Sequence, residues 1–334
     1  MAQISPIQPT PVGALRFNTD SSKLEYYDGN QWVNITSDSP EVQTGGTRGL
    51  SFKGNAPTNS TIIDYITVDT TGNAVDFGDH TSGRESAALG NRTRAVYHVG
   101  FQSPSPNAYV DTMEYVTVST TGNTTDFGNS TDPTIGAQGT MANSTRGIWA
   151  GGYYNINIID YITIAETGNA IDFGDLTIKQ RYMGCCASPT RGVLSAGTKF
   201  PGYHKQIDYI TMSTQGNTSD FGDLLEDHYH YFGGSNATRG VFMESYNGTA
   251  HSNIIEYVTI ATLGNAVDFG DTTVANGPNG IAASRTRAVQ MGYDGTNTMD
   301  YIQIATLGNA IDFGDATQAG RGGAGASNGH GGLG

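Results

Sequence analysis

The chain of 334 residues has few cysteines, few charged side chains and no hydrophobic run of membrane-spanning length. Its only cysteines, Cys185 and Cys186, are neighbours, so a bond between them would be strained and we expect two small buried side chains. A fold without disulfides suits assembly in a reducing cytoplasm. The N-terminus lacks the basic start and apolar stretch of a signal peptide, and no membrane insertion is expected.

Charge is scarce and unbalanced. Charged residues make up 14% of the chain, against a usual share of about 25%. Lys and Arg number 17 and Asp and Glu 31, which gives a net charge of −14. An acidic surface repels nucleic-acid phosphates and anionic membranes, so neither is expected as a partner. Glycine, in contrast, is abundant, with 46 residues.

One unit of about 48 residues occurs six times after residue 45. Each copy contains a tyrosine, a phenylalanine twelve residues later, and an arginine that follows threonine. Such a period indicates a repeat architecture. The tyrosines are Tyr65, Tyr115, Tyr161, Tyr209, Tyr257 and Tyr301; the phenylalanines are Phe77, Phe127, Phe173, Phe221, Phe269 and Phe313; the arginines are Arg48, Arg94, Arg146, Arg191, Arg239 and Arg287.

Each copy is predicted to form four short strands. Around residue 190 these are residues 184–188, 191–197, 206–213 and 217–223, which are rich in Ile, Val, Thr, Tyr and Phe. A Thr-Gly-Asn turn joins the third strand to the fourth, because Gly and Asn tolerate the positive φ of a tight hairpin. No long apolar pattern of helical period appears, so minimal helix is expected.

Six copies of four antiparallel strands predict an all-β fold, a six-bladed β-propeller over residues 45–334. No convincing first strand precedes Arg48, whereas residues 320–332 are similar to first-strand segments such as residues 181–188. We therefore expect a C-terminal strand to complete the first blade and close the ring without an exposed edge. A long β-solenoid is the alternative, although 48 residues per turn is large for one and closure would have no explanation.

The repeats resemble kelch-like blades over residues 45–334. The resemblance depends on the arrangement Arg181, Ser188-Pro189-Thr190-Arg191-Gly192, Ala196-Gly197, Tyr209 and Phe221-Gly222-Asp223, which the other copies echo. Two kelch features differ: the glycine doublet remains only at Gly151-Gly152, and the tryptophan of the last strand is absent. We expect the repeat phenylalanine to take over its packing.

Residues 1–44 are predicted to form a separate attachment module and linker. Strands are expected around Leu15–Phe17, Leu24–Tyr27 and Trp32–Ile35. Such a unit is too small to be securely stable alone, so it should dock onto a partner. Phe17, Tyr26, Tyr27 and Trp32 are the candidate attachment residues.

This N-terminal stretch is similar to segments of tailed-bacteriophage structural proteins, and the acidic Gly/Thr/Asn-rich repeats resemble those of virion proteins from phages of marine cyanobacteria. The resemblance implies a virion protein that is assembled in the host cytoplasm, contacts other virion proteins through residues 1–44, and trimerises there if it follows fibre bases.

No constellation for catalysis was found. Gly-x-Ser-x-Gly, phosphate-loop and His-Glu-x-x-His motifs are absent from the sequence, and the cysteine pair has no obvious base. We expect a protein that is not an enzyme and binds no cofactor or metal. His228 and His230, with Glu226 and Asp227 beside them, leave a metal site open, but solvent-exposed loop side chains are the preferred interpretation.

Two acidic residues recur in each copy, one before the tyrosine and one before the phenylalanine. They could form a ring of calcium sites, or they could form hydrogen bonds between blades; we prefer the second, because a feature copied six times is usually structural. The first set is Asp64, Glu114, Asp160, Asp208, Glu256 and Asp300, and the second is Asp76, Asp126, Asp172, Asp220, Asp268 and Asp312.

Variation is concentrated in the connections of one propeller face, between second and third strands and between consecutive blades. Aromatic side chains on loops of a rigid scaffold suit recognition of carbohydrate or protein. We therefore predict a phage structural protein of the tail, fibre or decoration type whose propeller is a candidate for binding a host glycan or protein. The alternative is a kelch-like carbohydrate-binding adhesin or lectin. The candidate recognition residues are Phe101, Tyr109, Tyr153, Tyr154, Tyr203, His204, Tyr229, Tyr231, Tyr246 and His251.

Overall fold

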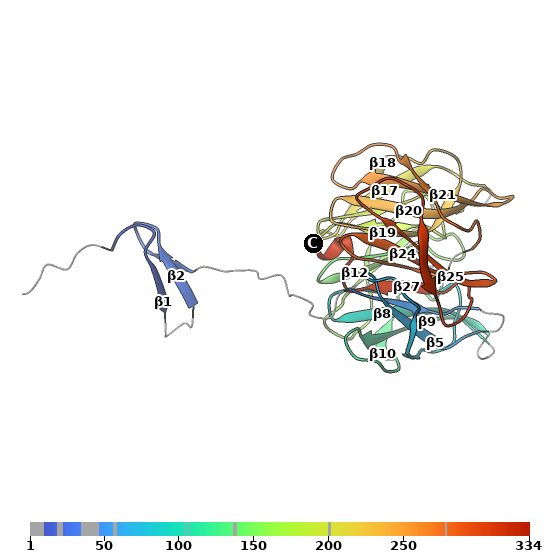
Figure 1. Cartoon of the computed structure of the whole chain (residues 1–334), viewed down its shortest axis with the longest axis horizontal. Coiled ribbons are helices and arrows are strands. Elements are labelled where there is room, and N and C mark those ends of the chain that lie inside the picture. The colour runs from blue at the N-terminus through green and yellow to red at the C-terminus, as the bar shows by residue number, and fades with distance from the viewer. Residues whose placement is uncertain are drawn as a thin grey trace, which may run out of the picture. The chain divides into compact units, whose positions relative to one another are not determined.

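The computed structural model describes residues 10–18, 23–34, 47–55, 59–103, 105, 107–135, 139–199, 202–277 and 279–334. The chain divides into two compact units, Met1–Thr44 and Gly45–Gly334, here called unit 1 and unit 2 (Figure 1). Within the described ranges, no helix has the length and apolarity needed to cross a membrane.

Unit 1 contains one three-stranded antiparallel sheet in the order β1-β2-β3. Its strands lie where the sequence predicts them, at β1 (Leu15–Asn18), β2 (Lys23–Tyr27) and β3 (Trp32–Asn34). The turn between β2 and β3 is closed by the Asp28 carboxylate, which accepts hydrogen bonds from the backbone N–H groups of Asn30 and Gln31 at 2.7 and 2.8 Å.

The described part of unit 2 contains six four-stranded antiparallel sheets. Sheet 1 comprises β27 (Ala324–Ser327), β4 (Arg48–Phe52), β5 (Ile62–Thr67) and β6 (Val75–Asp79). Sheet 2 comprises β7 (Ala87–Gly90), β8 (Arg94–Gln102), β9 (Ala108–Thr117) and β10 (Thr125–Asn129). Sheet 3 comprises β11 (Thr140–Ala142), β12 (Arg146–Ala150), β13 (Ile158–Thr163) and β14 (Ile171–Asp175).

The remaining sheets have the same order. Sheet 4 comprises β15 (Cys185–Ala187), β16 (Arg191–Leu194), β17 (Gln206–Thr211) and β18 (Ser219–Asp223). Sheet 5 comprises β19 (Tyr229–Ser235), β20 (Arg239–Tyr246), β21 (His251–Thr259) and β22 (Val267–Asp271). Sheet 6 comprises β23 (Ile281–Ala283), β24 (Arg287–Tyr293), β25 (Thr296–Gln303) and β26 (Ile311–Asp315), and the only helix of the described residues is the 3₁₀ helix η1 (Gly331–Leu333). The predicted all-β class is confirmed.

The C-terminal strand β27 completes sheet 1. It pairs antiparallel with β4, with Ala324 opposite Phe52 and Ser327 opposite Gly49. The pairing brings together segments from the two ends of unit 2, as the similarity of residues 320–332 to first-strand segments predicts. In Figure 1, β27 lies among strands that are coloured blue for the early part of the chain.

The first strands of the six sheets are neighbours in the order β7, β11, β15, β19, β23, β27 and back to β7. They run in the same direction, because Gly233 lies against Cys185 and Ser235 against Ala187, and Gly325 lies against Ile281. Together they line a cavity of about 70 Å³. Its lining is mostly Ala, Gly, Ser and Cys, since only small side chains fit where six strands converge.

Identical packing recurs between the sheets. All six repeat phenylalanines are at most 2% exposed, and each meets the repeat tyrosine of its own sheet edge to face, with ring centroids 5.8–6.2 Å apart. Each phenylalanine also lies in one hydrophobic core with buried side chains of the following sheet, so phenylalanine fills the packing position between sheets.

Cys185 and Cys186 are free and buried on opposite faces of sheet 4, one in the core with sheet 3 and the other in the core with sheet 5.

The repeat arginines join each sheet to the next. Each guanidinium lies over the tyrosine ring of its own sheet, 4.4–4.9 Å from the centroid, and donates to a backbone carbonyl of the following sheet at 2.8–3.5 Å. The pairs are Arg48 with Val118, Arg94 with Ile164, Arg146 with Met212, Arg191 with Ile260, Arg239 with Ile304, and Arg287 with Val68. The last pair connects sheet 6 back to sheet 1.

The first set of repeated acids makes the second series of links. Each carboxylate accepts a hydrogen bond from the second residue after the fourth strand of the preceding sheet, so the interpretation of these acids as structural is confirmed. The donors are Thr317 to Asp64, Thr81 to Glu114, Thr131 to Asp160, Thr177 to Asp208, the Leu225 N–H to Glu256, and Thr273 to Asp300.

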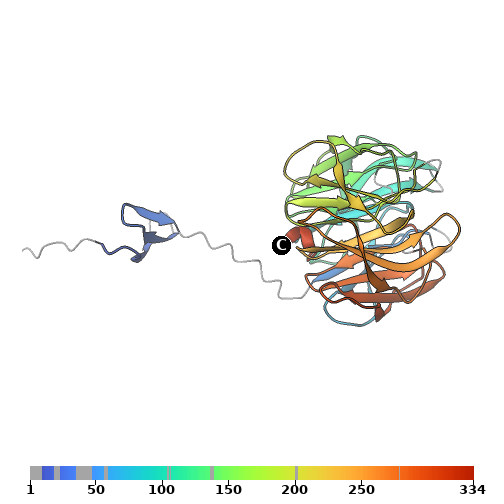
Figure 2. The same cartoon turned by 90° about the horizontal axis from the view of Figure 1, so that it is seen from above.

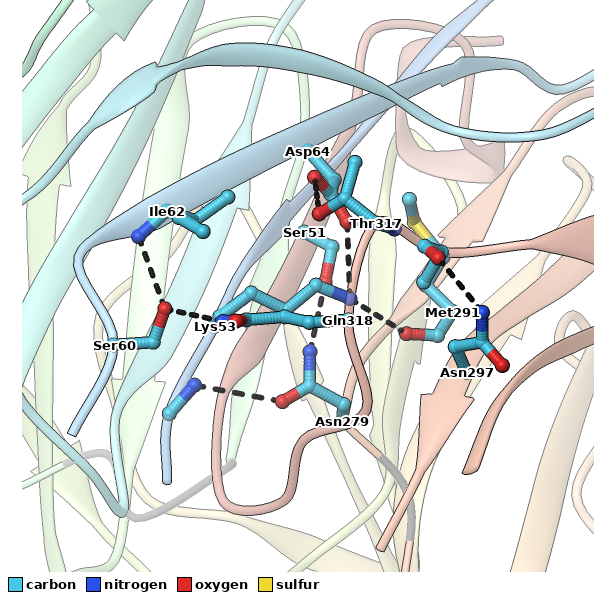
Figure 3. A network of polar contacts seen from close by, with 12 residues as sticks. Ser51, Lys53, Ser60, Ile62, Asp64, Asn279, Met291, Asn297, Thr317 and Gln318 are labelled. Carbon is cyan, nitrogen blue, oxygen red and sulfur yellow. Dashed lines mark hydrogen bonds and ion pairs between the residues drawn. The ribbon is translucent and has the colours of Figure 1, made fainter. Parts of the chain in front are cut away.

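A buried ion pair distinguishes the contact between sheets 6 and 1 (Figure 3). Lys53 Nζ lies 3.3 Å from Asp64 Oδ2, and both side chains are 0% exposed. The ammonium also donates to the Met291 carbonyl at 3.4 Å. Burial lowers the pKa of Lys53, and the charge of Asp64 opposes that shift. Beside the pair, the Asn279 amide donates to Ser51 Oγ at 2.8 Å.

Candidate functional site

Unit 2 has two faces, defined by the ends of the first strands. The C-terminus, which is marked in Figure 2, lies on one of them. We call the face at which these strands begin the tyrosine face, and the face at which they end the C-terminal face. The chain enters unit 2 on the C-terminal face, where the Thr47 carbonyl accepts a hydrogen bond from Val68 and the Arg48 N–H donates to the Asn328 side chain at 2.8 Å.

The C-terminus closes the cavity on its own face. His330 lines the cavity, and its Nε2 atom lies 2.7 Å from the Gly90 carbonyl at the end of β7. Gly332 lies so close to the Ala142 carbonyl that a Cβ atom would collide with it. Two arginines hold the last carbonyls, Arg92 that of Leu333 at 2.9 Å and Arg285 that of Gly334 at 2.6 Å.

The tyrosine face gathers most of the predicted recognition residues into two ring clusters. In the first, over sheets 2 and 3, Tyr109 contacts Phe101, Tyr153 and Tyr154, with centroid distances of 5.1, 4.7 and 5.8 Å. Tyr153 and Tyr154 also contact each other at 5.3 Å. Tyr154 is 69% exposed, so a ring is available to solvent at the edge of this cluster.

The second cluster lies over sheets 4 and 5. Tyr229 stacks with Tyr203 at 5.8 Å and contacts Tyr246 at the same distance, and Tyr246 meets His251 at 5.0 Å. Tyr229 itself is only 5% exposed. It therefore supports its neighbours from beneath and does not offer its own ring to solvent.

Residues that sequence reasoning did not select join the clusters. Tyr182 stacks with Tyr229 at 6.0 Å, and the Arg181 guanidinium lies over both Tyr153 and Tyr182, 4.4 and 4.8 Å from the centroids. Glu85 accepts hydrogen bonds from the hydroxyls of Tyr109 and Tyr182. Burial raises the pKa of both phenols, and the nearby charge of Glu85 adds to that shift.

Backbone strain marks two of these linking residues. Glu85 and Tyr182 have φ values of 53° and 58°, a region that costs non-glycine residues free energy and is enriched at functional sites. Both precede a first strand, β7 and β15, so they meet where the first strands begin. The sequence could have pointed to these two residues only by their position before a first strand, because their positive φ cannot be predicted from residue type.

The other predicted recognition residues differ in their surroundings. His204 is half-buried, with Nε2 2.6 Å from the Gln180 side-chain oxygen, which also accepts from the Gly197 N–H. Burial lowers the pKa of His204. The side chain of Tyr231 lies outside the described residues, as does that of His230.

The preferred interpretation of His228 as a solvent-exposed loop side chain is wrong. His228 is 3% exposed, and its Nε2 atom lies 2.9 Å from Glu256 Oε2. Glu256 is one of the repeated acids that join sheets, so His228 is recruited to the sheet 4–sheet 5 contact. Within the part of the chain that is described, no three His, Cys, Asp or Glu side chains are grouped to hold a metal ion.

The second set of repeated acids also differs from its interpretation as a set of links between blades. These residues lie on the fourth strands, where Asp76, for example, is exposed to solvent next to the buried Phe77. The fourth strand is the outer edge of each sheet, and alternate side chains point outward there. The preferred interpretation is therefore wrong for this set.

In unit 1 the candidate attachment residues lie on opposite faces of the sheet. Phe17 and Tyr26 share a face with Leu15 and Leu24, and these four side chains are 62%, 39%, 64% and 44% exposed. Register places them together, with Leu15 opposite Tyr26 and Phe17 opposite Leu24. They form what we call the apolar face of unit 1.

The other face of that sheet carries charged and aromatic side chains that contact one another. Arg16 Nε donates to Glu25 at 2.8 Å, and its guanidinium lies 4.2 Å from the centroid of Trp32. Trp32 in turn meets Tyr27, with centroids 5.5 Å apart. Tyr27 and Trp32 are thus engaged within unit 1, and the apolar face carries its exposed hydrophobic surface.

No protein-family description matches the chain, and no curated protein matches it either.

Proposed function

We propose that unit 2 is a six-bladed β-propeller and that the protein is a non-enzymatic structural component of a phage particle. The propeller is supported by the cyclic order of the first strands and by arginine and carboxylate links that lead from the sixth sheet back to the first. The particle assignment is supported by the resemblance of the repeats and of the N-terminal stretch to phage structural proteins.

In this proposal unit 1 attaches the protein to other virion proteins. A three-stranded sheet is marginal alone, and exposure of Leu15, Phe17, Leu24 and Tyr26 on one of its faces favours burial against a partner. The partner can be the same module of two further copies, which makes a trimer.

The observation that carries the proposal is the opposite placement of attachment and recognition on unit 2. The chain enters at Thr47 on the C-terminal face, whereas the ring clusters around Tyr109 and Tyr229 lie on the tyrosine face. A domain tethered at one face presents the other outward. The tyrosine face would therefore meet the host surface.

The second candidate function is a carbohydrate-binding adhesin that has no architectural part. It is favoured by the exposed ring of Tyr154 beside Tyr153 and Tyr109, because sugars stack their apolar faces on such rings. The two candidates differ in whether unit 1 assembles with virion proteins.

Adsorption to cells tests the recognition half of the proposal. Labelled full-length protein should bind a candidate host saturably, and Tyr154→Ala should abolish most of that binding. The matched control is Ile171→Ala, which removes a similarly exposed apolar side chain, 56% exposed, from an outer strand. A folded protein that adsorbs to no host in the panel would contradict surface recognition.

Sedimentation equilibrium tests the attachment half. The intact protein should sediment as a trimer, and the double variant Phe17→Ser with Leu24→Ser should be monomeric because it places hydroxyls on the apolar face. Val75→Ser, in a 52% exposed apolar residue of unit 2, is the control. A monomeric intact protein would contradict trimer formation through unit 1. Attachment to a different virion protein would then be tested by capture of purified virion proteins with unit 1.

A further inference from the structure

The lysine and arginine side chains of this acidic chain fall into two groups, those bound within the fold and those in the connections of one face. Outside unit 1, the six repeat arginines bind carbonyls between sheets, Arg92 and Arg285 hold the C-terminus, and Lys53 is buried with Asp64. Every other lysine and arginine of unit 2 lies in a connection of the tyrosine face. These six are Arg84, Lys179, Arg181, Lys199, Lys205 and Arg321.

Two of the six are neutralised by acids. Lys205 Nζ lies 3.7 Å from Asp223, and Arg321 Nη1 lies 3.1 Å from Asp294. The remaining four gather on sheets 2 to 4. Backbone bridges pair Arg181 with Thr198 and Thr198 with Tyr203, so Lys199 follows directly beside Arg181 and the second ring cluster.

Arg84 and Arg181 are held against aromatic rings. The guanidinium of Arg84 lies 4.6 Å from the centroid of Phe101, as that of Arg181 lies over Tyr153. Both buried Nε atoms have no hydrogen-bond partner among the described residues. Glu85 is the acid between them, and its carboxylate is occupied by two tyrosine hydroxyls. Exposed Lys179 and Lys199 add positive charge at the rim.

We propose that the tyrosine face binds an anionic saccharide, a polymer whose sugars carry carboxylate, sulfate or phosphate groups. The inference rests on the proposed recognition function and names its ligand class. Rings of Tyr153 and Tyr154 stack the sugar faces, while Arg84, Arg181 and the two lysines bind the acidic groups.

Acids around this face argue against nucleic acid as the ligand. The fourth strands end on the tyrosine face with Asp79, Asp175, Asp223, Asp271 and Asp315. With a net charge of −14, a strand carrying a phosphate at every nucleotide is repelled over most of its length. A saccharide whose acidic groups meet only the four cations without acidic partners avoids that repulsion.

Titration calorimetry on the full chain tests the proposal. The probes are oligogalacturonate, dextran sulfate and dextran phosphate, with neutral dextran, poly-L-glutamate and oligodeoxythymidylate for comparison. At least one charged saccharide should bind, and the best of the three identifies the acidic group. Binding should weaken as sodium chloride rises from 50 to 200 mM, because salt screens the charges.

Charge-matched variants localise the site. Arg181→Gln with Lys199→Gln should weaken binding about tenfold or more, since each lost charge removes a charge-assisted hydrogen bond. Lys205→Gln with Arg321→Gln removes the same charge from the same face at paired positions and should leave affinity within about twofold. Lys179→Gln with Lys199→Gln, both exposed, repeats the test with little risk to folding.

Equal binding of neutral dextran, poly-L-glutamate or oligodeoxythymidylate would overturn the proposal, as would equal losses in the paired and unpaired variants. Adsorption to cells without binding to any charged saccharide would overturn this inference and leave the recognition function standing. Absence of both would overturn the two together.

Discussion

The two faces of unit 2 are built in different ways from the same repeat. On the C-terminal face, the repeat arginine of every sheet donates a hydrogen bond to the backbone carbonyl just after the third strand of the next sheet, at 2.8–3.5 Å in all six sheets. On the tyrosine face no such uniformity holds: Tyr154 is exposed, Tyr229 is buried, and Arg181 bridges two clusters.

The difference separates structure from recognition. A contact made six times closes each sheet on the next, and its residues are committed to that task. The connections of the tyrosine face do not make this repeated contact, so they can differ in length and composition. Aromatic rings and cations without acidic partners lie in these connections. The residue type also varies at the position five residues after each repeat arginine, which is Lys53, Val99, Gly151, Ala196, Glu244 and Gly292 in sheets 1 to 6.

Removal of the C-terminal strand should have the largest effect on the stability of unit 2. Deleting residues 320–334 removes β27, which pairs with β4, and the segment that closes the cavity. We expect loss of cooperative thermal unfolding in calorimetry. A variant that still melts in one transition at an unchanged temperature would contradict closure by this strand, and deletion of residues 1–44 serves as the control.

Loss of the buried cation should have the next largest effect. Lys53→Met leaves Asp64 buried opposite no cation and should lower the free energy of unfolding by about 3–5 kcal/mol. Adding Asp64→Asn should recover part of that loss, because the uncompensated charge is gone. Urea unfolding measures both, and a single variant as stable as the parent would show that the pair contributes nothing.

Glu244 makes stability depend on pH. Burial raises its pKa well above the usual range, and the charge of Asp300 adds to the shift while the hydrogen bond with Tyr293 opposes it. The folded state therefore holds the proton more tightly, so this contribution is complete below the unfolded pKa of about 4.3 and is lost as pH rises through the folded pKa.

Glu244→Gln should remove that loss, which reaches about 1.4 kcal/mol per pH unit. The measured quantity is the difference in unfolding free energy between the two proteins from pH 5 to pH 8, in which the histidine contributions cancel. A difference that stays constant with pH would contradict a raised pKa.

The repeat arginines should give the smallest and most uniform effect. Arg146→Gln and Arg239→Gln each lose one cation–ring contact and one bond to the next sheet, which should lower the free energy of unfolding by about 1–2 kcal/mol. Because their surroundings are the same, the two losses should agree within about 0.5 kcal/mol. Clearly different losses would show that the sheets are not equivalent.

Much of the local structure could be predicted from the sequence. Alternating β-branched and aromatic residues between Gly and Asn turns led to four strands per copy, and the similarity of residues 320–332 to first strands led to their pairing with β4. The candidate site was predictable only in part, since its aromatic members are recognised by residue type in the variable connections, whereas Glu85 and Arg181 lie in the same connections without a distinguishing pattern.

Two errors have the same origin. His228 follows a fourth strand like many loop residues, yet it is buried because Glu256 of the next sheet is within 2.9 Å. The repeated acids look alike in sequence, but the first set points toward the neighbouring sheet and the second lies on an outer edge. In each case the outcome depended on whether a side chain of a different copy of the repeat lies within reach.

The sequence by itself determined the strands and their period, because these depend on short-range spacing and recur six times. Only the tertiary structure decided which connections meet. Glu85 and Tyr182 are 97 residues apart and share a hydrogen bond, because parallel first strands bring their beginnings together around one cavity. Spacing along the chain carries no record of that convergence.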